Sequence, residues 1–137
     1  MNNENVHDFK DGNGPVPASR HPNGGGWVAD TATVDYTAFV GLGAQVYGEA
    51  QVSGNARVSG EARVSGHARV SEDAAVSGYA LVSGNALVSG NARVYGYAWV
   101  SGNARVSGHA LVFGKARVFG KAQVSEDAVV YGNEVRS

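Results

Sequence analysis

Apolar and polar residues alternate along most of this chain, inside a unit of six residues. The unit reads V-S-G-N-A-R and recurs without an insertion through residues 28–135. Its first residue is always Val, from Val28 to Val130, and its fifth is Ala from Ala32 to Ala128. Ala and Val two residues apart, with a polar residue between them, predict a short strand with one buried face and one wet face.

The third residue of the unit predicts the turns between these strands. A Gly in every sixth position would cost a helix about 1 kcal/mol each relative to Ala, whereas a turn can use its tolerance of positive φ. We therefore expect an all-β fold without helices. Five units carry another residue at the third position: Asp30, Tyr36, Leu42, Glu72 and Glu126.

The spacing between similar outward residues predicts how the units stack. Strands this short must form a solenoid, in which each strand pairs with its equivalent in the next coil. A spacing of three units places Tyr95, Phe113 and Tyr131 in one column. A spacing of two units would instead place Arg57 on Arg69, and stacked like charges destabilise a sheet. The sequence predicts a single-stranded, triangular, parallel β-helix of six coils, with about 18 residues in each coil and a length of about 29 Å.

We expect three regions along the chain. Residues 1–27 form an irregular N-terminal cap segment, residues 28–135 form the β-helix, and residues 136–137 form a short tail. The cap segment holds all three prolines, and its expected apolar anchors are Val6, Phe9, Val16 and Trp27. The last coil is expected to leave an open sheet edge, guarded by Glu134 at an inward position and by Arg136 beside it.

Composition narrows the choice of function. An interior of Val and Ala has no room for a ligand, so any site must lie on the outer surface. The absence of Cys excludes disulfides and thiolate metal sites. Eleven basic and twelve acidic residues do not favour binding to nucleic acid or to an anionic membrane. The first residues lack the apolar stretch of a secretory signal, which favours a cytoplasmic protein.

The repeat resembles the hexapeptide-repeat superfamily, whose members form left-handed parallel β-helices. This resemblance rests on the Val at the first position of each unit, the small residue two positions before it and the Gly-containing turn. The lead segment H-P-N-G-G-G-W-V at residues 21–28 resembles a group of bacterial and phage or prophage proteins often labelled acyltransferases. The resemblance implies left-handed winding, whereas the general rule for parallel crossovers would give a right-handed coil.

The resemblance to acyltransferases of this superfamily implies a His general base and a substrate groove between subunits. His67 and His109 are the weak candidates for that base, and both occupy the fourth position of a unit. Glu49 shares a column with His67, and Asp127 shares one with His109. A solvated turn residue is the simpler interpretation of both, because no nucleophile or anion cradle accompanies them. We assign no catalytic residue and no cofactor.

Metal binding is not predicted either. The related γ-class carbonic anhydrases bind zinc through three His residues. In this chain His67 and His109 lie seven units apart on different sides of the prism, so they are not expected to share a metal ion. Neither His7 nor His21 is marked as a ligand. The acidic pairs at residues 72–73 and 126–127 share a corner but lie roughly 14 Å apart, too far to share a calcium ion.

The outer surface of the C-terminal half carries the most informative signal. Large apolar residues stand there at positions that normally hold Ser, Asn, Arg or Gln. A contiguous exposed patch of this kind indicates an interface more often than a set of aromatic ladders that only stabilises the strands. The predicted interface residues are Tyr79, Leu81, Tyr95, Tyr97, Trp99, Leu111, Phe113, Val129 and Tyr131.

The sequence therefore predicts a non-enzymatic, self-associating scaffold or binding protein of phage or prophage origin. Its expected partner is a second copy of the same chain, bound through the predicted interface residues. End-to-end contact between two copies is a further expected geometry. The alternative is a hexapeptide-type acyltransferase that acts on an acyl-coenzyme A.

Overall fold

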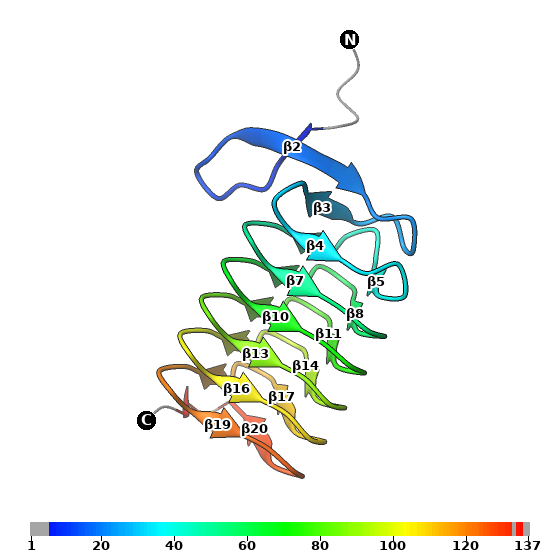
Figure 1. Ribbon diagram of the computed structural model, residues 1–137. Coiled ribbons are helices and arrows are strands. Elements are labelled where there is room, and N and C mark those ends of the chain that lie inside the picture. Colours follow the sequence, from blue (N-terminus) through cyan, green and yellow to red (C-terminus); the bar gives the residue numbers. More distant parts are fainter. Residues whose placement is uncertain (1–5, 133, 136–137) are drawn as a thin grey trace.

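Residues 6–132 and 134–135 are described by the computed structural model, and they form a stack of β-coils (Figure 1). These residues contain strands and turns but no helix, so the described part has no helix long and apolar enough to cross a membrane. Equivalent strands three units apart pair in parallel, as Arg63 with Leu81 and Leu81 with Trp99. The predicted all-β solenoid of about six coils is confirmed. Its left-handed winding stays a prediction.

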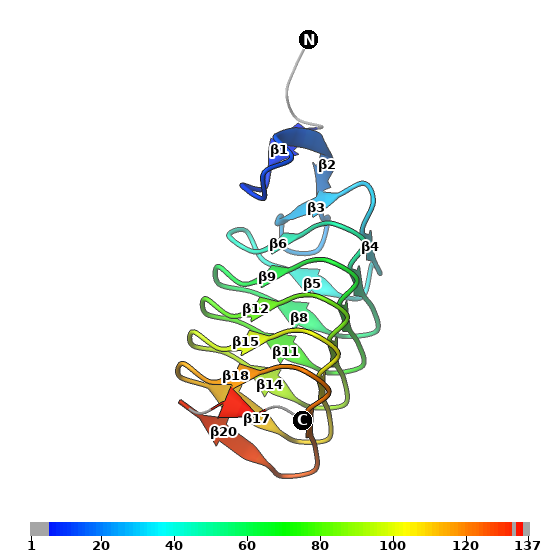
Figure 2. The same ribbon diagram turned by 90° about the vertical axis from the view of Figure 1, so that its left-hand side faces the viewer.

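The strands form three sheets, one for each side of the prism (Figures 1 and 2). Sheet I contains β1(Val6–Asp8), β2(Pro15–Arg20), β3(Trp27–Ala29), β6(Gln45–Val46), β9(Arg63–Val64), β12(Leu81–Val82), β15(Trp99–Val100), β18(Arg117–Val118) and β21(Glu134–Val135). Sheet II contains β4(Thr33–Val34), β7(Gln51–Val52), β10(Arg69–Val70), β13(Leu87–Val88), β16(Arg105–Val106) and β19(Gln123–Val124). Sheet III contains β5(Phe39–Val40), β8(Arg57–Val58), β11(Ala75–Val76), β14(Arg93–Val94), β17(Leu111–Phe113) and β20(Val129–Tyr131).

Three corners connect these sheets in each coil. The first corner leads from sheet I to sheet II, the second from sheet II to sheet III, and the third from sheet III back to sheet I. Backbone bonds join successive coils at strands and corners alike. In one coil, the N–H groups of Arg63, Ser65 and His67 donate to carbonyls of the next coil at 3.0, 2.9 and 2.8 Å. The hydrogen bonds therefore run along the axis of the stack.

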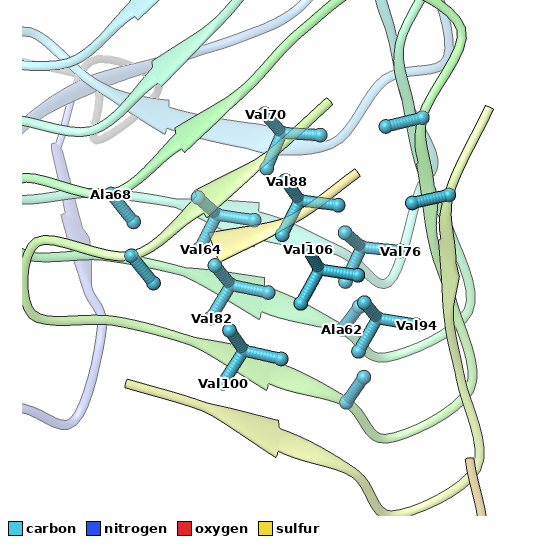
Figure 3. Close-up of a cluster of buried hydrophobic side chains, with 14 of the residues drawn as sticks. Ala62, Val64, Ala68, Val70, Val76, Val82, Val88, Val94, Val100 and Val106 are labelled. Atoms are coloured by element: carbon cyan, nitrogen blue, oxygen red, sulfur yellow. The ribbon is translucent and has the colours of Figure 1, made fainter. Parts of the chain in front are cut away.

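The core is a set of Val and Ala columns inside the prism. The first-position Val side chains from Val40 to Val118 are at most 1% exposed. Figure 3 shows Val64, Val82 and Val100 in one row, one from each coil. Because every level carries the same small side chains, the coils can stack without voids and without a change in diameter.

The third-position Gly residues are required for two separate reasons. Gly84 has φ +64, a conformation that L side chains rarely adopt. A Cβ atom at this residue would also stand 2.9 Å from the backbone nitrogen of Gly102 in the next coil. Glu72 and Glu126 adopt the same conformation, with φ +59 and +56. These two acidic residues are therefore turn residues, as the sequence predicts.

The N-terminal segment differs from the irregular cap expected from its Pro and Gly content. Strands β1 and β2 form an antiparallel hairpin, and β2 continues sheet I by pairing with β3. The prolines do not interrupt β2: Pro15 and Pro17 pair with β1, while residues 18–20 pair with β3. Of the expected anchors, Phe9 is fully buried, whereas Val6 is exposed.

Aromatic contacts hold this hairpin on the solenoid. Phe9 stacks on Tyr47 at 4.8 Å, and His7 stacks on Trp27 at 4.6 Å. The side-chain amide of Gln45 donates to Nε2 of His7 at 3.2 Å, which requires that nitrogen to be unprotonated. Burial, and then the charge of Arg20, lowers the pKa of His7 from its ordinary value of 6.5.

The lead segment closes the N-terminal edge of sheet III. Val40 donates to the carbonyl of Asn23 at 3.0 Å, and Gly26 donates to the carbonyl of Val40 at 2.9 Å. His21, which is 6% exposed, donates from Nε2 to the carbonyl of Ala38 at 2.8 Å. In later coils the equivalent carbonyls accept a backbone N–H from the coil before them. The buried imidazole therefore replaces a missing peptide donor.

The final strand departs from the three-unit register. Glu134 pairs with Arg117 and Val135 pairs with Val118, which is one residue short of three full units. The backbone register that the repeat predicts for Glu134 is therefore shifted by one residue. The shift keeps a Val in the column of Val118. Arg136 lies outside the described residues.

We predict that Gly84→Ala destabilises the protein by at least about 1–2 kcal/mol, because Ala is strained at this φ and its Cβ crowds the next coil. Denaturant unfolding measures the effect. The control Ser83→Ala keeps the adjacent backbone and should change the free energy of unfolding by less than about 0.5 kcal/mol. Equal effects of the two substitutions would contradict the role given to the turn.

A second prediction concerns the stability of the N-terminal hairpin at acidic pH. Because the pKa of His7 is lower in the folded protein than in the unfolded chain, its stabilising contribution is present above about pH 6.5 and is lost as the pH falls below that value. Amide exchange in β1 and β2, corrected for intrinsic rates, should accelerate between pH 7.5 and 5.5. His7→Phe keeps an aromatic ring without a titrating proton and should abolish this dependence. An unchanged pH response in that variant would exclude His7 as its source.

Candidate functional site

The predicted interface residues come together on neighbouring columns in the C-terminal half of the solenoid. They wrap around the third corner, from sheet III on one side to sheet I on the other. We call this surface the aromatic ridge; its members are Tyr79, Leu81, Tyr95, Tyr97, Trp99, Leu111, Phe113, Val129 and Tyr131.

Stacking between coils fixes the rings of the ridge. Tyr79 and Tyr97 stack at 5.1 Å with an interplanar angle of 4°, and Tyr95 and Phe113 stack at 5.0 Å with an angle of 3°. Tyr131 continues the second stack at 4.9 Å, tilted by 33°. Because the ring faces cover one another, the ridge presents mainly ring edges to its surroundings.

The two flanks of the ridge add aliphatic surface and a large indole. On sheet III, Leu111 pairs with Val129, and on sheet I, Leu81 pairs with Trp99. Trp99 is 46% exposed, although the guanidinium of Arg117 lies 4.9 Å from its ring centroid. Exposed Arg93, Lys115 and Arg117 border the ridge. The result is an apolar surface at an outer corner of the prism, bordered by basic side chains.

His67 has an acidic neighbour, as its column predicts. Its Nδ1 lies 3.4 Å from Oε1 of Glu49, and the two side chains are 66% and 69% exposed. Both line an open groove on the outer surface together with Thr31, Thr33, Gln51 and Arg69. A pair this exposed is solvated on most sides and contributes little to orientation or stability.

His109 does not form the pair with Asp127 that its column would permit. Its backbone N–H donates to the carbonyl of Glu126 at 2.7 Å, and no ion pair of its side chain is found within the described residues. The part of the chain placed by the structure also contains no group of three His, Cys, Asp or Glu side chains that could hold a metal ion.

Sequence reasoning missed the roles of several aromatic and His residues. His7 and Tyr47 pack against the hairpin, and His21 is a buried hydrogen-bond donor. For His21 the available signal was its place three units before Phe39, at the start of the Gly-rich lead. Phe119 lies at the first corner and is half-buried, away from the ridge.

Comparison with known proteins identifies the repeat. A family model described as YdcK beta solenoid repeat matches residues 50–61, 62–79 and 88–102. No curated protein and no solved structure matches the chain significantly. The matched segments lie in the regular coils and include part of the ridge. The chain is thus a β-solenoid whose central repeats are similar to YdcK solenoid repeats, in agreement with its resemblance to hexapeptide-repeat β-helices.

Proposed function

We propose that this protein is a non-enzymatic scaffold that associates with copies of itself through the aromatic ridge. The observation that carries the proposal is the gathering of nine apolar residues on adjoining columns, at outward positions where most other units carry a polar residue. The core does not require them, because inward Val and Ala fill the interior at every level.

The chemistry of the ridge favours a protein partner over a small ligand. Stacked rings show their edges, so they offer no flat platform for a sugar or a base. Burial of one large aromatic side chain contributes about 2–3 kcal/mol, and interface energy concentrates in such residues. A copy of the same chain supplies a matching apolar surface and a matching basic rim, which can remain at the wet periphery of the contact.

The rest of the molecule is consistent with a structural role. Its coils repeat one cross-section, and the hairpin and lead segment close one end. Such a body presents side chains at fixed intervals on a rigid surface. The phage or prophage origin suggested by the lead segment belongs to this proposal as well, since it rests on that resemblance alone.

The acyltransferase alternative has less support. Its best base is His67 with Glu49, and this pair lies in an open polar groove. A general base is most effective where its surroundings are dry and its partner is oriented. Neither condition is met by two side chains that are about two-thirds exposed.

The ridge is tested by the double substitution Leu81→Ser and Trp99→Ser. These outward residues contribute to one flank of the ridge, so the assembled mass measured by light scattering should fall while circular dichroism still shows β structure. The matched control is Tyr36→Ser with Leu42→Ser, which removes two apolar residues that are 84% and 72% exposed in the N-terminal half. If both variants keep the wild-type mass, the ridge is not a contact surface.

A separate prediction addresses catalysis. The purified protein should transfer no acetyl group from acetyl-coenzyme A to amine or hydroxyl acceptors, and a calorimetric titration with coenzyme A should show no binding. Turnover that His67→Ala or His109→Ala abolishes would contradict the scaffold and favour the acyltransferase.

A further inference from the structure

A cavity lies outside the prism, between the β1–β2 hairpin and the part of the solenoid next to it. The hairpin contributes Phe9 and Val16 to its lining, and the solenoid contributes Ala29 and Tyr47. Its lining is mainly apolar, and its volume is about 280 Å³. This volume is close to the lower end of the range of small-molecule sites, about 300–1,000 Å³. The cavity is therefore suited to a ligand of about one ring.

Aromatic and aliphatic packing forms the walls of the cavity. Phe9 is 1% exposed, and its ring stacks on Tyr47 with the ring centroids 4.8 Å apart. Phe9, Ala18 and Ala29 form a second hydrophobic cluster, separate from the Val and Ala interior, and Val16 and Tyr47 are partly buried against it. Because Val16 and Tyr47 also line the cavity, a bound apolar group would extend this cluster. An aromatic ring suits such walls, since rings pack favourably against one another.

The charged groups that line the cavity all carry the same sign. Asp11 and Asp30 belong to the lining, and none of the described lining residues is basic. Lys10, in the same loop as Asp11, does not line the cavity, and the guanidinium of Arg20 lies 4.5 Å from the ring centroid of Trp27. Two carboxylates at one cavity favour a positively charged ligand and oppose an anion.

The two carboxylates differ in how they are held. Asp11 accepts hydrogen bonds from the backbone and the side-chain amide of Asn13, both at 3.1 Å. The carboxylate of Asp30 has no hydrogen bond or ion pair within the described part of the chain. Asp30 is also the third residue of its unit at the first corner, where every later coil carries Gly. A free carboxylate therefore occupies this position only in the coil beside the hairpin.

We propose that this cavity binds a small organic cation, in which a primary ammonium group is attached to a body of about one aromatic ring. The ring packs against Val16 and Tyr47, and the ammonium binds Asp30, with Asp11 as a second acceptor. An ammonium group has three donors and no acceptor, so it suits a pair of carboxylates. Because the rim is exposed, the ammonium keeps part of its hydration while the ring is buried. This site goes beyond the proposed scaffold, since the ridge does not contribute to it.

The preference for a cation is tested with phenethylammonium, phenethyl alcohol and hydrocinnamate, each titrated into the full chain and followed through amide chemical shifts. Phenethylammonium should bind with a dissociation constant of about 1 mM or lower, and the neutral alcohol at least about fivefold more weakly. Hydrocinnamate should cause no saturable shift. An alcohol that binds as tightly as the ammonium, or the absence of a saturable shift at residues 9–16 with phenethylammonium, would overturn the proposal.

Amide exchange gives a second measure of the same site. A ligand that binds only the docked hairpin stabilises it against opening. Saturating phenethylammonium should therefore slow exchange in β1 and β2, while exchange in β16 and β17 stays unchanged. Equal slowing in all four strands would show that the ligand binds elsewhere and would contradict the site.

The substitution Asp30→Asn tests the position of the ammonium. Because Asp30 is exposed and its carboxylate has no partner within the described residues, the fold should be unchanged. The dissociation constant of phenethylammonium should rise about fivefold, while that of phenethyl alcohol stays the same. The matched control Asp73→Asn removes an exposed carboxylate at the second corner and should leave both constants unchanged. Equal losses in the two variants would reduce the effect to general attraction by an acidic surface and overturn the site.

A final titration tests the source of the cation. n-Butylammonium reproduces the side chain of Lys without a ring and should bind at least about fivefold more weakly than phenethylammonium, because less apolar surface is buried. Equal affinity would indicate a Lys side chain of a partner protein and overturn the small-molecule assignment. The Leu81→Ser, Trp99→Ser variant should bind phenethylammonium as the wild type does. Failure of the ridge and failure of this site are therefore distinguishable.

Discussion

Every feature of this protein depends on the hydrogen bonding of one coil to the next. These bonds run along the axis and lock the register at three repeat units, so each residue is placed directly against its equivalent in the adjacent coil. Sequence spacing is thereby converted into spatial contact. The same constraint aligns the Val interior, brings Gly residues into close approach at the corners and stacks the rings of the ridge. It also decides which charges meet, since each of the paired Arg residues from Arg57 to Arg105 lies between uncharged residues.

The regular coils could be predicted from the sequence because each of their positions has a single physical requirement. An inward residue must be small and apolar, a turn residue must accept positive φ, and stacked neighbours must not repel. The ends were not predictable in this way. The hairpin forms although β2 contains Pro15 and Pro17, and His21 acts through a buried hydrogen bond to Ala38. At the last strand, the backbone register pairs Val135 with Val118, one residue short of three full units.

The candidate site was likewise predictable only in part. The column rule predicted that Tyr79 would meet Tyr97 and that Tyr95 would meet Phe113. It also placed His67 beside Glu49, but it did not reveal how exposed that pair is. Whether aligned rings form a contact surface depends on which ring faces remain free and on the convexity of the corner, and neither follows from spacing. Columns therefore establish proximity within one molecule, while recognition of a second molecule depends on shape.

The axial direction of the hydrogen bonds has a mechanical consequence. Each coil is bound to its neighbour by many parallel bonds of similar length, and each contacts only the coils beside it. Compression along the axis is shared among all three sides, so the body behaves as a stiff strut. Tension applied to the two ends of the polypeptide would act differently, because it would load the outermost coil alone. Extension would then proceed one coil at a time, and each step would release the contour length of one coil.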